Sequence, residues 1–207
     1  MKKGKFIVIE GGEGAGKSSQ IKKLKEILGD DLVVTREPGG SPYAEEIREI
    51  ILNSENAGQA NAKTHFGLFW AARADHIKNT ILPAIESGKH VVCDRFDSST
   101  YGYQIFGQEH QELKEMFFQF RDFFLGNCKP DLYIYMQVDT ETGLSRRTEG
   151  NMEMNHFDKR KVDFHERMRK GYAEFFEKVP SITVDANPSF DEVTDNLLKE
   201  VQKVIND

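Results

Sequence analysis

The sequence predicts an α/β fold in which helices flank a central, mainly parallel sheet of about five strands. Short runs rich in β-branched residues alternate with longer stretches whose apolar residues recur at helical spacing, which is the pattern of β-α-β units. The runs 6–9 and 90–93 are apolar almost throughout, as in strands that helices cover on both faces. No internal repeat interrupts the alternation, so we expect one domain over residues 1–207. The expected strands are Phe6–Ile9, Leu32–Thr35, His90–Cys93, Leu132–Val138 and Ile182–Val184.

Apolar spacing, with flanking glycine, proline and asparagine residues, predicts the helices that connect these strands. The stretch 146–161 differs from the rest because charged and polar residues crowd it. Such a stretch is typical of a mobile cover over a binding site, and equally of a solvated loop followed by a helix start. The expected helices are Ser18–Leu28, Tyr43–Asn53, Lys63–Glu86, Glu109–Leu125, Thr140–Thr148, Phe157–Lys178 and Ser189–Ile205.

Composition and charge exclude several classes of protein. A chain of 207 residues, 38% hydrophobic and 30% charged, suits a soluble globular protein with a sizeable core. The 28 Lys and Arg against 34 Asp and Glu give a net charge of −6, which argues against a broad nucleic-acid-binding surface. The apolar run 6–9 behind the basic start is far too short for a signal segment or a membrane span. We therefore expect a cytoplasmic protein with neither a nucleic-acid nor a membrane partner.

Cysteine and histidine spacing excludes further classes. Cys93 and Cys128 lie far apart and belong to no metal-ligand pattern, so we expect reduced thiols in the core. The sequence contains neither the H-E-x-x-H pattern of zinc proteases nor the G-x-S-x-G turn of serine esterases. Hydrolases of these two kinds are therefore excluded.

The first predicted strand runs into a glycine-rich segment that fits G-x-x-x-x-G-K-[ST] ahead of a helix. Glycines there let successive backbone N–H groups turn toward phosphate oxygens, and the helix N-terminus adds partial positive charge. Lys17 would reach the β- and γ-phosphates, and the Ser18 hydroxyl would ligate Mg²⁺. The sequence therefore predicts an ATP·Mg²⁺ site. Its residues are Gly11, Gly12, Glu13, Gly14, Ala15, Gly16, Lys17, Ser18 and Ser19.

Asp94 and Arg95 follow the third predicted strand at its carboxyl end, where open α/β sheets place their ligands. Asp94 can hold Mg²⁺ directly or through water, and Arg95 can clamp a phosphate or neutralise charge on a transferring phosphoryl group. A structural pair that only caps the next turn is the simpler alternative for these two residues.

The segment 35–42, Thr-Arg-Glu-Pro-Gly-Gly-Ser-Pro, predicts a shaped loop before a helix that carries Arg48. A cis Glu37–Pro38 bond would be one way of aiming Arg36 into a site. A tight connection with surface arginines fits the same spacing.

Phe69 and Arg73 lie at positions i and i+4 of a predicted helix and so share one face. An aromatic ring beside a guanidinium can stack on a nucleobase and hydrogen-bond to its carbonyl edge. Aromatic residues at helical spacing are nevertheless more often part of the core. We interpret the phenylalanines of 117–124 in that way, together with a candidate subunit contact.

Longer segments carry a resemblance that is more specific than the phosphate loop, which by itself marks only a superfamily. They are Phe6–Ser19, Thr35–Gly40 with Glu46–Arg48, Phe69–Arg73, Asp94–Gln104, Pro130–Tyr135 and Phe164–Tyr172. On these segments the chain resembles, over nearly its whole length, the bacterial type of thymidylate kinase, the P-loop kinase that phosphorylates dTMP. The resemblance implies a P-loop nucleoside-monophosphate-kinase fold, transfer of the γ-phosphoryl group of ATP to dTMP in dTTP biosynthesis, Mg²⁺ as cofactor and a homodimer.

The resemblance also implies roles on the phosphate side of the site. Glu13 matches the acid near the 3′-hydroxyl of the acceptor's deoxyribose, whereas Lys17 and Ser18 serve ATP and Mg²⁺. The residues that match arginines holding the acceptor phosphate, or bridging it to the donor, are Arg36, Arg48 and Arg95.

On the base side, Phe69 matches the residue that stacks on thymine and Arg73 the one that bonds a thymine carbonyl. Gln104 matches the amide that reads the base edge, and Tyr103 the aromatic that disfavours a ribose 2′-hydroxyl. The residues that border this pocket are Ser99 and Thr100.

Some positions depart from the family pattern. The lid, expected at about residues 146–161, carries His156 where the family pattern has arginine, so Arg146 and Arg147 become the candidates for the cation that the lid supplies. Gly102 stands where alanine is more usual, and Tyr101 is bulky beside the expected base pocket. A looser base selectivity would follow from these two residues.

Two other functions remain open at this point. The first is a P-loop kinase for another acceptor, such as dUMP, dGMP or a nucleoside, although a nucleoside needs fewer phosphate-facing arginines than the three predicted here. The second is a non-catalytic ATP-binding module, which the departure at His156 favours.

Overall fold

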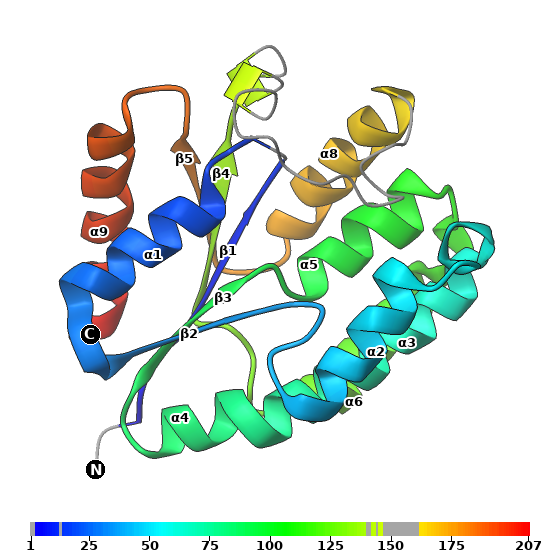
Figure 1. Cartoon of the computed structure of the whole chain (residues 1–207), viewed down its shortest axis with the longest axis horizontal. Coiled ribbons are helices and arrows are strands. Elements are labelled where there is room, and N and C mark those ends of the chain that lie inside the picture. Colours follow the sequence, from blue (N-terminus) through cyan, green and yellow to red (C-terminus); the bar gives the residue numbers. More distant parts are fainter. Residues whose placement is uncertain (1–2, 13, 140–141, 144, 147–161) are drawn as a thin grey trace.

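A five-stranded parallel sheet in the order β2-β3-β1-β4-β5 forms the centre of the molecule (Figure 1). The computed structural model describes residues 3–12, 14–139, 142–143, 145–146 and 162–207. Each strand lies within two residues of its predicted bounds, so the predicted α/β class is confirmed. The strands are β1 Phe6–Gly11, β2 Leu32–Arg36, β3 His90–Asp94, β4 Leu132–Gln137 and β5 Ser181–Asp185.

Helices connect the strands and cover both faces of the sheet. The predicted helix 63–86 is a continuous run of α3, a π-helical turn at Ile77–Ile81 and α4. The part of the predicted helix 157–178 before residue 162, and most of the predicted helix 140–148, lie outside the described residues. The α-helices are α1 Lys17–Leu28, α2 Pro42–Asn53, α3 Ala62–His76, α4 Leu82–Glu86, α5 Asp97–Thr100, α6 Lys114–Leu125, α8 Val162–Phe176 and α9 Phe190–Asn206.

Strand β1 divides the core into two layers because its side chains alternate between the faces of the sheet. Phe6 and Val8 pack with aromatic residues of α3, α6 and α8, whereas Ile7 and Ile9 pack against α1 and α9. Figure 1 shows α1 and α9 on one side of the sheet and the remaining helices largely on the other. Burial of β1 on both faces explains why its first four residues, 6–9, form an unbroken apolar run.

α5 and a π-helical stretch at Tyr101–Gly107 form a helical segment that the sequence does not predict. Serine, threonine and glycine in 98–102 are poor helix formers, so local propensity does not predict it. Buried polar contacts hold its start: Asp97 accepts hydrogen bonds from Arg121 Nε at 2.7 Å and from the Tyr133 hydroxyl at 2.5 Å. Tertiary contacts therefore stabilise a helix that the local sequence does not favour.

Both cysteines are buried free thiols, which confirms the sequence prediction. Burial raises the pKa of the Cys128 thiol to about 11 and that of Cys93 well above its usual range. Among the described helices, none combines the length and the apolar composition that crossing a bilayer requires.

We expect Asp97→Ala to lower the free energy of unfolding by about 3–5 kcal/mol, because it leaves the buried Arg121 guanidinium without its carboxylate. Urea denaturation followed by circular dichroism measures this change. The matched control is Asp122→Ala, which removes a carboxylate that pairs with Lys129 at the surface. We expect the control to leave the unfolding free energy nearly unchanged, and an equal effect of the two substitutions would contradict the prediction.

Candidate active site

The phosphate loop joins β1 to α1 at the carboxyl edge of the sheet. Gly14 and Gly16 have φ of +73° and +81°, so the loop needs glycine at these two positions. The Lys17 ammonium folds back across the loop and donates hydrogen bonds to the carbonyl oxygens of Gly11 at 3.0 Å and Gly12 at 3.2 Å. Glu13, predicted to contact the acceptor sugar, lies outside the described residues.

Ser18 and Asp94 meet beside this loop because β1 and β3 are neighbouring strands, with Ile9 opposite Asp94. The Ser18 hydroxyl donates to Asp94 Oδ2 at 3.0 Å. Asp94 Oδ1 is buried and has no hydrogen-bond partner among the described residues. Hydroxyl and carboxylate oxygens are ligands that Mg²⁺ accepts, so this pair fits the predicted metal position. No cluster of three or more His, Cys, Asp or Glu side chains that could hold a metal ion occurs in the described part of the chain.

A pocket opens next to the phosphate loop, between α2, α3 and the helical segment 97–107. It brings together most of the residues predicted to bind the acceptor nucleotide. Thr100 lies behind it and accepts a hydrogen bond from Arg73 Nη2 at 3.3 Å. Tyr101, expected beside this pocket, instead packs in the aromatic core against Phe117. The lining residues are Glu37, Pro38, Arg48, Leu52, Phe69, Arg73, Arg95, Phe96, Ser99, Tyr103 and Gln104.

The inner end of the pocket carries unpaired hydrogen-bonding atoms. Arg73 is 1% exposed, and Glu37 accepts from its Nε at 2.9 Å and pairs with its Nη2 at 2.7 Å. Arg73 Nη1 and both polar atoms of the Gln104 amide are buried without a partner among the described residues. Buried donors and acceptors are nearly always satisfied in native proteins, so these atoms are available to a ligand that carries both donor and acceptor groups.

Glu37 and His76 also belong to this site, although no sequence pattern predicts them. Glu37 Oε1 lies 3.1 Å from His76 Nδ1, and His76 Nε2 lies 2.7 Å from the Thr35 hydroxyl. This buried chain fixes Glu37 and, through it, the Arg73 guanidinium. The Glu37–Pro38 bond is cis, as the sequence analysis anticipated. One feature of the sequence could have indicated Glu37: it is the one acidic residue in the loop segment 35–42.

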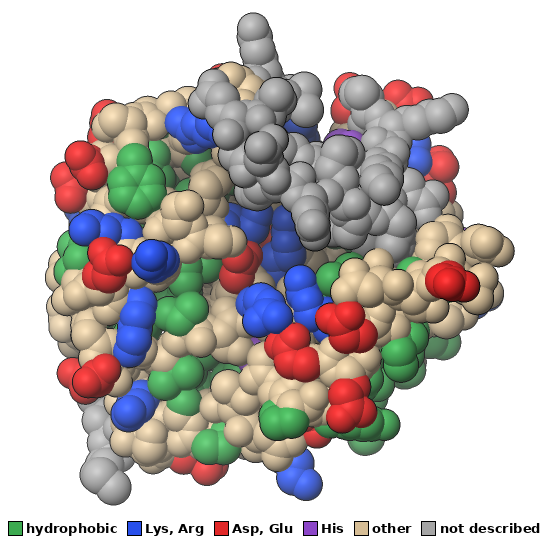
Figure 2. Space-filling view, in the orientation of Figure 1, with side chains coloured by type: hydrophobic (Ala, Val, Ile, Leu, Met, Phe, Trp, Pro, Cys, Tyr) green, Lys and Arg blue, Asp and Glu red, His purple; other side chains and the backbone are tan. Residues whose placement is uncertain are grey.

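Basic side chains surround the outer end of the pocket. Figure 2 shows Lys and Arg side chains gathered around the hollow near the centre of this face. Arg36 pairs with Glu45 at 2.9 Å, and Arg48 Nη1 donates to the Pro38 carbonyl at 2.6 Å. Burial and the positive charge of Arg36 lower the pKa of Arg48.

Arg146 has a different environment from the one expected of a lid cation. Its guanidinium donates to the carbonyl oxygens of Ala186 at 2.6 Å, Asn187 at 3.0 Å and Pro188 at 3.2 Å. Arg146 therefore braces the loop between β5 and α9. Arg147, His156 and the rest of the predicted lid after residue 146 lie outside the described residues.

A phosphate loop on a parallel sheet, a Ser–Asp pair beside it and a second pocket rich in arginine define a P-loop phosphotransferase with a separate acceptor site. The model of the family described as thymidylate kinase matches residues 9–197. The chain belongs to the thymidylate kinase family.

Relatives and a solved structure agree with this assignment. The chain is 38% identical to the thymidylate kinase of Halalkalibacterium halodurans, with 98% of each chain covered. It is 40% identical to that of Caulobacter vibrioides, with 94% of each covered. The crystal structure of thymidylate kinase from Ehrlichia chaffeensis superimposes with a TM-score of 0.74 at 25% identity, covering 97% of this chain and 99% of the other.

Proposed function

We propose that this chain transfers the γ-phosphoryl group of ATP to dTMP, giving dTDP and ADP for dTTP synthesis in the cytoplasm. The unpaired buried atoms of Arg73 and Gln104 are the single observation that carries the choice of acceptor. Thymine presents carbonyl acceptors and an N–H donor along one edge, which complements a guanidinium donor and an amide. Membership of the thymidylate kinase family supports the same acceptor.

On the base side, Phe69 stacks on thymine, Arg73 donates to a carbonyl and Gln104 bonds to the adjoining ring edge. Ser99 and Thr100 border the ring, with Thr100 placed through its bond to Arg73. Tyr103 lines the pocket, and the Arg95 guanidinium lies over its ring, with Cζ 5.5 Å from the ring centroid; we assign this ring to the sugar side. A ribose 2′-hydroxyl would have to fit against this ring.

On the phosphate side, Arg36, Arg48 and Arg95 hold the acceptor phosphate for in-line attack on the γ-phosphate. The loop Gly11–Ser19 binds the donor through its backbone N–H groups and the Lys17 ammonium. Glu13 is assigned to the acceptor sugar. Positioning and charge neutralisation supply most of the catalysis in such reactions, so little covalent chemistry is required of the protein.

Ser18 and Asp94 would hold Mg²⁺, and the ion would offset negative charge on the donor phosphates. The exposed hydroxyl–carboxylate bond between them and the unpartnered Asp94 Oδ1 support this assignment. Arg147, with Arg146, remains assigned to the lid at about 146–161, although the described bonds of Arg146 favour a bracing role.

We also infer a homodimer. Phe123 and Met116 on α6 are 80% and 45% exposed, which is unusual for large apolar side chains on one helix. The family resemblance favours a second copy of this chain as the occupant.

An ADP-release assay with ATP·Mg²⁺ and a panel of dTMP, dUMP, dCMP, dGMP, dAMP and thymidine tests the proposed function. Preference for dTMP supports it, whereas faster turnover of another monophosphate identifies a kinase with a different acceptor. ATP binding without turnover of any acceptor identifies a non-catalytic module.

We expect Gln104→Leu to raise the KM for dTMP by at least about tenfold, since a buried polar contact to a ligand is worth roughly 1–3 kcal/mol. The same change should leave thermal stability equal or higher, because it replaces buried polar atoms that lack partners in the unliganded protein. Steady-state kinetics and a melting curve measure both effects. An unchanged KM for dTMP, or a clear loss of stability, would show that Gln104 has a structural role instead.

We expect Lys17→Ala to lower kcat by at least about a hundredfold, as removal of a group that stabilises transition-state charge does in comparable sites. The control is Lys25→Ala on the same helix, since the Lys25 ammonium bonds to the carbonyl oxygens of Gly29 and Leu32 and pairs with Asp30, all away from the loop. Single-turnover measurements with dTMP distinguish the two variants. Turnover of Lys17→Ala close to that of the control would refute the donor-site assignment.

A further inference from the structure

The carboxylate of Glu10 is buried completely at the end of β1, directly before the phosphate loop. Its Oε1 accepts hydrogen bonds from the hydroxyls of Ser99 at 2.6 Å and Ser98 at 3.0 Å, and from the backbone N–H of Phe96 at 3.3 Å. So many donors fix the carboxylate in one orientation. This oxygen of Glu10 is therefore fully engaged with protein partners.

The other oxygen of Glu10 holds Arg95. Arg95 Nη1 donates to Glu10 Oε2 at 3.3 Å and lies within hydrogen-bond distance of Ser99 and Tyr172 as well. In the described part of the chain these bonds all use Nη1, so the other guanidinium nitrogens are left to face the pocket that Arg95 lines. The backbone of Arg95 has φ of +67°, a conformation unusual for a residue with a side chain. The surroundings thus impose one orientation on Arg95.

Tyr172 supplies the remaining contact from α8. Its hydroxyl donates to Glu10 Oε2 at 2.9 Å, accepts from Arg95 Nη1 at 3.2 Å and lies 3.1 Å from the Ser99 hydroxyl. The side chain is fully buried, and its ring stacks on Phe176 with an interplanar angle of 6°. Burial, reinforced by the Glu10 charge, raises the pKa of Tyr172, so the phenol stays a neutral donor. Tyr172 therefore links α8 to Arg95 by a hydrogen bond.

We propose that Tyr172 is a positioning residue for phosphoryl transfer: its hydroxyl, bonded to both Glu10 and Arg95, fixes the Arg95 guanidinium against the acceptor phosphate. This inference rests on the proposed function, because it assigns Arg95 to that phosphate. It adds a residue of α8 to a site otherwise built from the ends of β1, β2 and β3 and the helices that follow these strands.

The physical basis is the geometry required of the arginine. Removal of the hydroxyl leaves Nη1 with Glu10 at 3.3 Å and Ser99 at 3.4 Å, which are its two longer contacts. A displacement of about 1 Å in a group that aligns reacting atoms can cost on the order of a hundredfold in rate. Substrate affinity falls less, because the charge of Arg95 remains near the phosphate.

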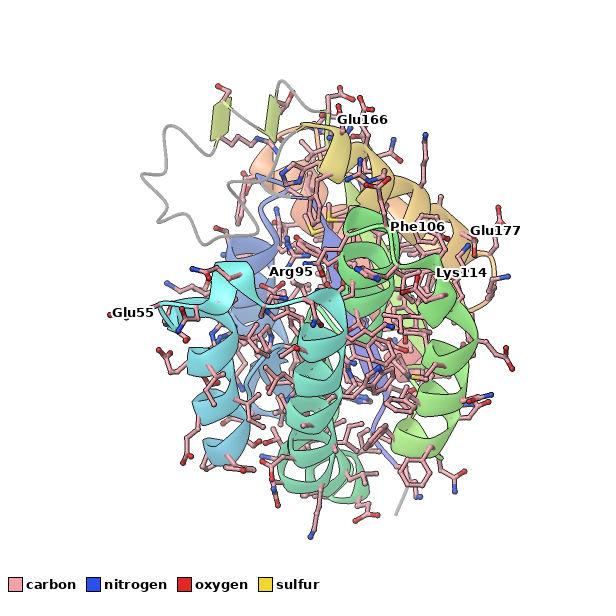
Figure 3. The ribbon with its side chains drawn as sticks, turned by 90° about the vertical axis from the view of Figure 1, so that its right-hand side faces the viewer. Glu55, Arg95, Phe106, Lys114, Glu166 and Glu177 are labelled. Atoms are coloured by element: carbon pink, nitrogen blue, oxygen red, sulfur yellow. The ribbon has the colours of Figure 1, made fainter. Side chains whose placement is uncertain are left out.

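Tyr172→Phe tests this inference, with Tyr101→Phe as its matched control. Tyr101 is also fully buried, and its hydroxyl donates to a carboxylate of the same helix, Glu174, at 2.5 Å. Glu174 pairs with Lys114, which lies over the Phe106 ring at 4.4 Å. Figure 3 shows Phe106 and Lys114 together beside α8 and apart from Arg95. The control therefore removes a similar bond without touching Arg95.

We expect Tyr172→Phe to lower kcat by at least about tenfold while the KM values for dTMP and ATP change by less than about threefold. Tyr101→Phe should leave kcat within about twofold of the original, even where both variants lose similar thermal stability. Equal kcat for the two variants, or a change confined to KM, would overturn the inference.

The Arg95→Ala variant shows whether Tyr172 affects kcat by positioning Arg95 or independently of Arg95. If Tyr172 acts through Arg95, adding Tyr172→Phe to Arg95→Ala should change kcat by less than about twofold. Losses that multiply in the double variant would mean that Tyr172 acts by another route, and the inference would be wrong.

A spectroscopic readout distinguishes failure of this inference from failure of the proposed function. The Arg95 side-chain Nε–H signal in ¹⁵N correlation spectra, assigned with Arg95→Ala, should shift or broaden in Tyr172→Phe and stay in place in Tyr101→Phe. An unmoved signal overturns the positioning role whichever acceptor the enzyme uses. Absence of dTMP turnover in the original protein, with a moved signal, overturns only the assigned substrate.

Discussion

The cost of burying charge governs the arrangement of this site. Three carboxylates are almost fully buried near the carboxyl edge of the sheet, and each holds an arginine: Glu10 with Arg95, Glu37 with Arg73 and Asp97 with Arg121. A buried ion left without its partner costs several kcal/mol, so each pair constrains where its arginine can lie. The Asp97 pair supports the helix that follows β3, and the other two pairs aim arginines into the acceptor pocket.

Strand register brings these groups together. Because β1, β2 and β3 are parallel neighbours, Ile9 and Arg36 both lie opposite Asp94. The Arg95 backbone N–H donates to the Ile9 carbonyl, and the Glu37 N–H donates to the Asp94 carbonyl, each at 3.0 Å. Backbone bonds thus continue past the ends of the strands and fix the loops that carry the functional side chains. The strand register therefore determines where the functional side chains of these loops lie.

Local sequence patterns predicted the parts of the molecule that local physics determines. Unbroken apolar runs located the strands, and glycines before a lysine located the phosphate loop. The helical segment 97–107 was missed because long-range contacts of Asp97 stabilise it against its own composition. Glu10 and Tyr172 were missed for a related reason: a strand-end acid and a helix-face tyrosine have no special spacing, and their role arises only where distant segments meet.

In the unliganded site, the polar side chains at the base end and at the phosphate end differ in whether they already have protein partners. At the base end, the polar atoms of Gln104 stay unpaired, so a base that bonds to them need not displace a protein partner within the described part of the chain. At the phosphate end, the basic side chains already have partners: Arg36 pairs with Glu45, and Lys17 donates to loop carbonyl oxygens. These bonds must be exchanged for phosphate oxygens, which offsets part of the binding free energy. Binding of the base therefore costs no protein hydrogen bond at Gln104 among the described residues. Binding of the phosphates breaks existing bonds, but the arginine and lysine charges that attract them are already in position.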